Sequence, residues 1–188
     1  MTIFLILAPY AAFALLMLVT SAAASLFAAA AICLAVIGFD MVRGRSVKIL
    51  GVGSVIVFVA VGSYLMFAET NPSTSGVKFA VDTGIFLVTL LSIVIRIPFT
   101  LQYALEAVDT ETAALPGFIR ANYIITWAWT ASMLLMMIGN VALIYVPGLP
   151  LWSSLLIAFA ARNSAVYFTK WYPEYRKAKY GAPAATTQ

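Results

Sequence analysis

Arg162 and Asn163 stand inside an otherwise apolar stretch that runs from Pro150 to Lys170. A helix of about 20 apolar residues spans the ~30 Å hydrocarbon core of a bilayer, so this stretch is long enough to cross a membrane. A charged side chain at that depth costs roughly 2.5–3.5 kcal/mol on insertion scales. We therefore expect Arg162 to face the interior of a helix bundle, where an acidic side chain, carbonyl groups or water satisfy its donors.

Arg162 has two possible roles. In a structural role it pairs with an acid, and Asp40 is the expected partner because Arg162 can reach toward the end of the bundle where Asp40 lies. In a functional role it attracts an anion into a water-filled pocket. Asn163 is rotated by about 100° around the helix from Arg162, so we expect it to hydrogen-bond a different helix.

Asp82 and Asn140 form a second polar pair inside apolar stretches. Counted from the nearer ends of their stretches, both lie roughly 8–9 Å deep at 1.5 Å per residue. We expect the two side chains either to hydrogen-bond and tie their helices together, or to line a vestibule on that side of the membrane.

Catalytic and metal-binding chemistry has little support. The chain has no histidine and a single cysteine, Cys33, which excludes histidine metal sites, Ser-His and Cys-His nucleophile pairs and an internal disulfide. It also lacks an HExxH motif, a phosphate-binding loop and paired carboxylates at one depth. We expect Cys33 to be a packing residue, and the protein to be no enzyme and to need no cofactor.

The composition belongs to a membrane protein. Of 188 residues, 63% are hydrophobic and 10% are charged, whereas soluble domains have about 25% charged residues. The 11 basic residues exceed the 7 acidic ones. Because these charges lie in loops, membrane topology explains them, and we do not expect nucleic acid as a partner.

The apolar runs predict an all-α, polytopic membrane protein in which a single domain, residues 1–180, forms a bundle of six transmembrane helices. The predicted spans are 3–19, 22–39, 49–68, 77–97, 123–146 and 150–170. Residues 99–109 alternate apolar and polar side chains at helical spacing, which predicts a short amphipathic helix at the membrane interface. Residues 181–188 are small and polar, and we expect a mobile tail there.

The N-terminal spans allow other interpretations. If the first two runs formed one re-entrant unit, five spans would remain. The first run also resembles a signal peptide, but no basic residue precedes Arg43, so we interpret it as a retained span. In the second span Ala24, Ala28 and Ala31 share one stripe. Small residues at this spacing favour close packing, either against the first span or in a dimer.

The basic residues predict the orientation of the chain. With six spans, Lys78 alone lies on one side, and nine basic residues lie on the other: Arg43, Arg45, Lys48, Arg96, Arg120, Lys170, Arg176, Lys177 and Lys179. The positive-inside rule then places both termini in the cytoplasm. Trp171, Tyr172 and Tyr175 would anchor the inner interface.

Residues 115–146 carry a loose pattern: Leu115-Pro116, Arg120 and Asn122, Trp127 or Trp129, Gly139-Asn140, and Ile144-Tyr145-Val146. This pattern resembles the second half of the bacterial intracellular septation protein A family. The chain departs from the family after Trp152, where Ser-Ser-Leu replaces a Trp-Val-Asn-Phe-Lys run. The resemblance implies a non-catalytic inner-membrane protein tied to envelope synthesis and division, with no active-site residues.

The sequence favours two functions that belong to different classes. The first is a structural or accessory envelope protein that acts through contacts with lipid, with other membrane proteins or with a second copy of the chain. The second is a small channel or transporter for an anion or a neutral solute, with Arg162 in the pathway. A continuous hydrated cavity beside Arg162 would favour the second.

Overall fold

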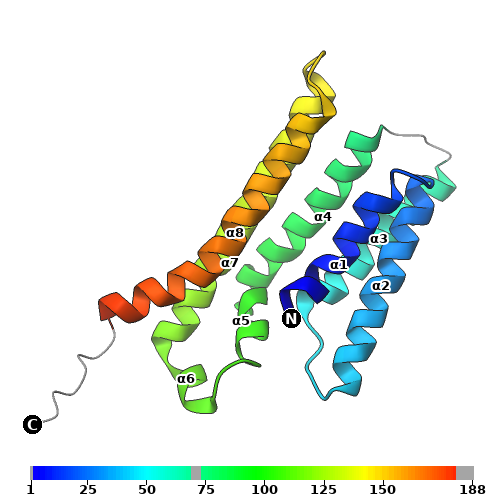
Figure 1. The fold of residues 1–188 in the computed structure, drawn as a ribbon. Helices are drawn as coiled ribbons and strands as arrows, with labels where there is room; N and C mark the ends of the chain where they lie inside the picture. Colours follow the sequence, from blue (N-terminus) through cyan, green and yellow to red (C-terminus); the bar gives the residue numbers. More distant parts are fainter. Residues whose placement is uncertain (1, 69–72, 181–188) are drawn as a thin grey trace, which may run out of the picture.

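The computed structural model describes residues 2–68 and 73–180, and within them every regular element is a helix (Figure 1). In chain order these are α1 (Thr2–Leu16), α2 (Ala22–Val42), α3 (Ile49–Phe67), α4 (Thr74–Val94), α5 (Phe99–Ala104), α6 (Thr110–Ala114), α7 (Pro116–Tyr145) and α8 (Leu151–Tyr180). The predicted tail, 181–188, lies outside the described residues.

Four of the described helices, α2, α3, α4 and α7, are long and apolar enough to cross a membrane. A shorter apolar stretch, Leu7–Leu16, lies in α1. α8 is 30 residues long, but Arg162, Asn163 and the basic C-terminal part lower its mean hydropathy. The described residues confirm the all-α prediction, and the four helices fit a multi-pass membrane protein by length and composition, while apolarity alone does not assign a crossing to α1 or α8.

The long helices form a row in which each packs against the next (Figure 1). α1, α2 and α3 pack in sequence and form what we call the N-terminal unit, and α7 and α8 pack as the C-terminal hairpin. α4 contacts α3 on one side and α7 on the other, so it joins the two parts. The α2–α3 turn, α5 and α6 lie near one end of the bundle along the helix axes. The α1–α2 and α7–α8 turns lie near the opposite end (Figure 1).

The small residues of α2 divide between two environments. Ser25 and Ala29 are fully buried inside the N-terminal unit, whereas Ala24 and Ala31 are exposed. Close helix packing therefore uses the stripe of Ser25 and Ala29.

α4 ends three residues earlier than predicted, at Val94 rather than Ile97. Arg96 adopts a left-handed backbone with φ 63°, and the Ile97 amide donates to the Ser92 carbonyl over 2.9 Å. This 6→1 bond around a left-handed residue is a Schellman-type ending. The chain has therefore already turned before it reaches Pro98.

The amphipathic helix predicted over 99–109 is shorter in the structure, because α5 ends at Ala104 and α6 is a separate helix. Asp109 caps α6: its carboxylate accepts a 2.7 Å hydrogen bond from the Thr112 amide. The same bond holds the pKa of the exposed Asp109 carboxyl below its usual range. A capping residue needs an extended backbone, so Asp109 cannot also lie within a helix.

α8 continues ten residues past its predicted end at Lys170, to Tyr180. Pro173 lies within it and supplies no backbone N–H to the helix. Figure 1 shows α8 bending in its C-terminal part. Arg176, beyond the proline, donates a 3.1 Å hydrogen bond to the Gly117 carbonyl at the start of α7. The end of α8 is therefore held against α7.

α3 and α4 approach closely at two glycines. A Cβ atom added at Gly53 would lie 2.4 Å from Val88 Cγ1, and one at Gly84 would lie 2.6 Å from Val57 Cγ1. Each helix thus presents a glycine to a valine of the other. Small residues at helix crossings allow backbones to approach in membrane bundles, and here they seat α4 against the N-terminal unit.

We expect Gly53→Ala to lower the free energy of unfolding by about 1–3 kcal/mol, the range for overpacking a filled core. Adding Val88→Ala should recover much of this loss, because it removes the methyl carbons that the new Cβ would meet. Thermal unfolding in detergent measures both variants. Gly38→Ala is the control, since nothing lies within 4 Å of a Cβ there. Equal stability of Gly53→Ala and Gly38→Ala would contradict the close approach.

Candidate functional site

Asp82 and Asn140 meet where α4 packs on α7. Asn140 Nδ2 donates a 2.7 Å hydrogen bond to Asp82 Oδ2, and Asn140 is only 5% exposed. The hydrogen bond predicted between them is therefore present. It joins α4 to the C-terminal hairpin and fixes the orientation of one carboxylate oxygen.

Arg162 and Asn163 point to different sides of α8. Arg162 is half-buried and lines a cavity that Asp82 also lines. Asn163 is exposed, and its Nδ2 donates a 2.7 Å hydrogen bond to the Phe159 carbonyl on its own helix. The prediction that Asn163 bonds a different helix is wrong, because a neighbouring carbonyl one turn back satisfies the amide.

The predicted pairing of Arg162 with Asp40 is also wrong. Asp40 instead forms ion pairs with Arg45, at 3.3 Å, and with Lys48, at 3.8 Å. The physical reason is position across the row: Asp40 belongs to the N-terminal unit and Arg162 to the C-terminal hairpin. The turn that follows Asp40 supplies nearer cations.

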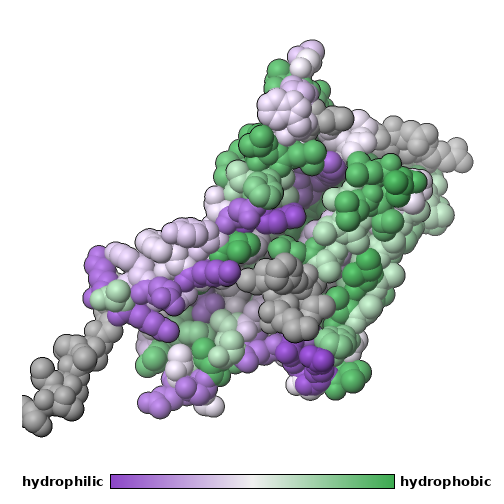
Figure 2. Space-filling model, in the orientation of Figure 1, coloured by the Kyte–Doolittle hydropathy of each residue, from purple (hydrophilic) through white to green (hydrophobic). Residues whose placement is uncertain are grey.

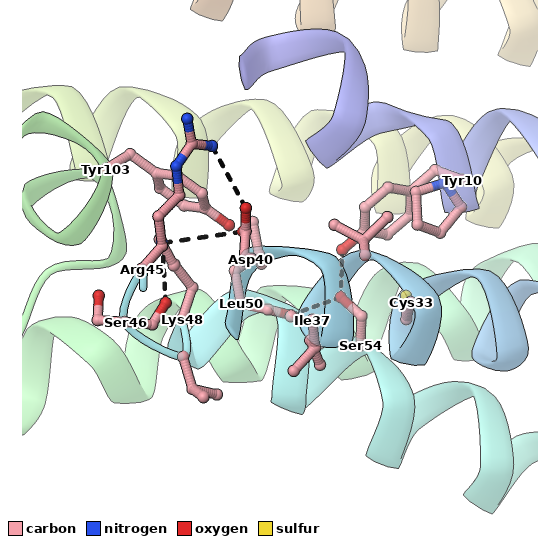
Figure 3. A pocket seen from close by; sticks show the side chains of 14 residues that line it. Tyr10, Cys33, Ile37, Asp40, Arg45, Ser46, Lys48, Leu50, Ser54 and Tyr103 are labelled. Carbon is pink, nitrogen blue, oxygen red and sulfur yellow. Dashed lines mark hydrogen bonds and ion pairs between the residues drawn. The ribbon is translucent and has the colours of Figure 1, made fainter. Parts of the chain in front are cut away.

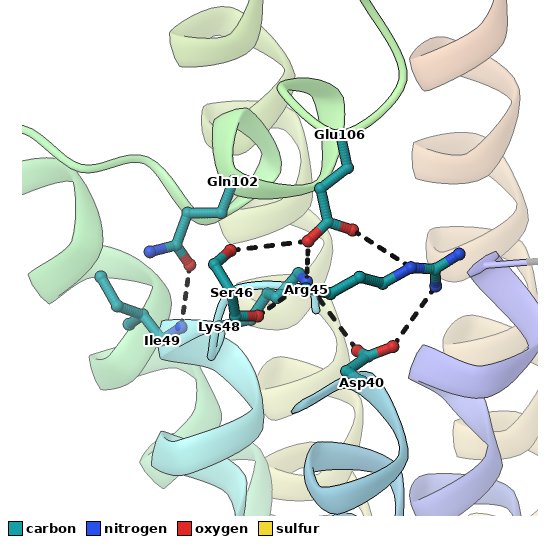
Figure 4. Close-up of polar contacts among 7 residues, drawn as sticks. All are labelled: Asp40, Arg45, Ser46, Lys48, Ile49, Gln102 and Glu106. Carbon is teal, nitrogen blue, oxygen red and sulfur yellow. Dashed lines mark hydrogen bonds and ion pairs between the residues drawn. The ribbon is translucent and has the colours of Figure 1, made fainter. Parts of the chain in front are cut away.

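The two cations and two carboxylates at the α2–α3 turn form a charge network: Asp40, Arg45, Lys48 and Glu106 (Figure 4). Lys48 is 4% exposed and forms ion pairs with both Glu106 and Asp40. Glu106 also lies 3.9 Å from Arg45. The network therefore ties the α2–α3 turn to the segment that follows α5.

A hydrogen bond beside the network adds to this connection. The Ile49 amide, at the start of α3, donates to Gln102 Oε1 over 2.8 Å (Figure 4). The Lys48 ammonium donates a 2.8 Å bond to the Ser46 carbonyl. From the sequence, Lys48 is predicted to be a loop charge and Glu106 to lie in the amphipathic helix over 99–109. No signal in the sequence links residues 58 positions apart.

A cavity of about 410 Å³ lies between the N-terminal unit and the C-terminal hairpin. Its wall is mostly apolar and comes from α1, α3, α4, α5, the start of the α5–α6 connection, α7 and α8. In Figure 2 hydrophilic side chains lie in the hollow between two hydrophobic flanks on this face. The volume falls within the range of ligand pockets, about 300–1,000 Å³.

The polar groups of the cavity wall are mostly satisfied by the protein itself. Thr100 Oγ1 donates to the Asn122 carbonyl over 2.8 Å, and Trp129 Nε1 donates to Thr169 Oγ1 over 2.9 Å. Arg162 differs: within the described part of the chain, its guanidinium forms no hydrogen bond or ion pair. Its five N–H donors therefore remain available to a molecule in the cavity.

Two basic side chains influence the single carboxylate of Asp82. Arg162 and Lys78 both attract the Asp82 carboxylate electrostatically, and Lys78 lies one helical turn away on α4. Neither cation forms an ion pair with Asp82 within 4.0 Å in the described residues, so both act on it at longer range. In a low-dielectric setting such charges act over longer distances than in water.

A second, smaller space of about 40 Å³ lies behind Tyr10 and Tyr103, which line both spaces. Figure 3 shows the Tyr10 hydroxyl directed at Ser54, with which it forms a hydrogen bond. Ser54 Oγ in turn donates to the Leu50 carbonyl over 2.6 Å. The space has room for about one or two water molecules, so the larger cavity is the one that can hold a solute.

The described residues contain no group of three or more His, Cys, Asp or Glu placed to hold a metal ion. Comparison with known protein families, curated proteins and solved structures gives no significant match to this chain. The chemistry of the site is therefore inferred from its own groups. These are an apolar cavity, one available guanidinium and one oriented carboxylate.

We expect Glu106→Gln to lower the free energy of unfolding by about 1–3 kcal/mol, because buried Lys48 loses one of its two carboxylates. Lys48→Met should cost less, since it removes the buried charge together with its bonds. Thermal unfolding in detergent compares them, with exposed Glu111→Gln as the control. A Glu106→Gln protein as stable as the control would show that Lys48 does not depend on Glu106.

Proposed function

We propose that this chain is a multi-pass protein of the bacterial inner membrane that binds a small solute in the cavity and carries it across part of the bilayer. It works without catalysis and without a cofactor. The observation that carries this proposal is Arg162: an arginine inside a long helix lines the cavity and forms no hydrogen bond or ion pair with the described residues. Such a residue is by default a functional candidate in a membrane protein.

The same proposal gives the bundle six crossings, with α1 and α8 as the first and last. Arg162 faces the cavity, while Leu155, Leu156 and Phe159 of α8 are 55–72% exposed and suit contact with lipid. Leu155 and Phe159 lie seven and three residues before Arg162, on the same side of α8, so this side is apolar and exposed nearer the α7–α8 turn and lines the cavity at Arg162. The excess of basic residues at the end that carries the α2–α3 turn supports a cytoplasmic location for both termini.

Topology is tested with single cysteines in a Cys33→Ala background. We expect Thr20→Cys and Ser73→Cys, at exposed turns, to react with a membrane-impermeant thiol reagent added outside intact cells. Ala178→Cys, near the end of α8, should react only after the membrane is opened. Protection of Thr20→Cys in intact cells would argue that α1 and α2 form a re-entrant unit, and labelling of Ala178→Cys from outside would contradict six crossings.

Solute binding requires that water reach the cavity. On α7, Met136 lines the cavity and is 9% exposed, whereas Ile138 is 55% exposed on another side. We expect Met136→Cys to react with a water-soluble thiol reagent much faster than Ile138→Cys, because the thiolate forms only where water is present. Equally slow reaction at both positions would mean that water does not reach the cavity, and it would refute the proposed carrier function.

The second candidate is an accessory envelope protein, which residues 115–146 favour. This septation-like segment forms α7 with its preceding cap, and its Asn140 and Trp129 both make bonds to other helices of the chain. These bonds serve helix packing. A dry cavity, together with recovery of a partner membrane protein by crosslinking in native membranes, would support this role.

A further inference from the structure

We propose that the cavity binds an amphiphilic monoanion: a molecule with an apolar body and a single anionic headgroup of the carboxylate type. This inference rests on the proposed function and names the chemistry of the solute. The headgroup binds Arg162, and the apolar body extends along α8 toward Pro173. Three observations carry it: the charges near Asp82, the available guanidinium and the shape of the wall.

The charged groups beside the cavity select for one negative charge. Asp82 is engaged by Asn140 at 2.7 Å, whereas Arg162 lines the cavity and forms no hydrogen bond or ion pair within the described residues, so its positive charge is uncompensated at close range. A monoanion would neutralise it. A second negative charge would lack a partner in a low-dielectric wall, and a cation would add to the excess, and both situations carry a large free-energy cost.

The geometry of the two charged groups divides their roles. Asp82 has one oxygen engaged by Asn140 at 2.7 Å, which holds the carboxylate toward α7. The Arg162 guanidinium is a rigid planar fork without a protein acceptor in the described residues. A carboxylate matches that fork with two parallel hydrogen bonds. Arg162 is therefore the group that would bind the headgroup, while Asp82 remains engaged with Asn140.

The remainder of the wall suits an apolar body. Arg162, Thr169 and Pro173 line the cavity from one side of α8, and eleven residues separate the first from the last, about 16 Å along the helix. Opposite them, Ile85, Met133 and Trp129 contribute apolar surface. Methionine side chains adapt to ligands of varied shape. A medium-length alkyl chain would remain in contact with this wall over most of its length.

Trp129 offers a direct reporter of binding, because it lines the cavity. Replacing Trp127, Trp152 and Trp171 with phenylalanine leaves it as the single tryptophan, since the chain has four. The protein is placed in phosphatidylcholine nanodiscs and titrated with decanoate brominated at its far end. We expect saturable quenching of Trp129 that unlabelled decanoate reverses and that decanol, decylamine and decanedioate do not.

Arg162→Gln should weaken decanoate binding about tenfold or more, as expected for the loss of charge-assisted hydrogen bonds, with the thermal unfolding temperature unchanged or raised. The matched control is Asn163→Ala, which alters the adjacent, exposed residue and should leave affinity unchanged. Radiolabelled decanoate binding to the unaltered chain, measured by scintillation proximity, repeats the comparison without the tryptophan substitutions.

Three outcomes would overturn the inference. Quenching that rises without saturation, equally in Arg162→Gln, would mean that decanoate only partitions into the bilayer. Equal competition by decanol would mean that the cavity binds neutral amphiphiles. The assignment of an anionic headgroup would then be wrong, while the proposed carrier function would remain. Absence of saturable binding by every probe, with Met136→Cys unreactive, would refute the carrier as well.

Discussion

The carboxylate of Asp82 constrains how the helices of the bundle pack. It lies in α4, an apolar helix, where an unpaired charge costs several kcal/mol. Asn140 donates to it from α7, and Arg162 and Lys78 attract it from α8 and from the preceding turn of α4. Three helices must therefore meet at this depth. Because α4 also packs on α3 through Gly53 and Gly84, this requirement connects the two parts of the bundle.

The short helix α5 links the charge network to the cavity. On one side Gln102 accepts from the first amide of α3, and Glu106, just beyond α5, forms ion pairs with the α2–α3 turn. On the other side Phe99, Thr100 and Tyr103 contribute to the cavity wall. The polar bonds at this end of the bundle thus determine where the cavity ends, although none of the charged network residues lines it.

Depth along the helices could be predicted from the sequence, and position across the bundle could not. Counting residues from the span ends correctly paired Asp82 with Asn140, because their helices are neighbours. The same counting paired Arg162 with Asp40 and failed, because the two residues lie in opposite parts of the row. The contact between Lys48 and Glu106 was also missed, since lateral packing brings together residues that share no local pattern. Local hydrogen bonds explain two further errors: the Asp109 carboxylate caps α6 instead of lying within the predicted amphipathic helix, and the Asn163 amide donates to a carbonyl of its own helix.

The charged side chains inside and near the bundle fall into two sets with different consequences. In the network, Arg45 and Lys48 balance Asp40 and Glu106, so the set is neutral and its bonds are made within the protein. In the cavity wall the charged residues are Arg162 and Asp82, and the guanidinium has no hydrogen-bond acceptor in the described chain. A neutral set of charges whose groups are already paired within the protein stabilises the packing of helices and leaves few groups to bind a ligand. An arginine whose donors are unsatisfied at the wall of an apolar cavity is stabilised when an anion binds, and for this reason we propose α8, rather than the more heavily charged turn, as the binding site.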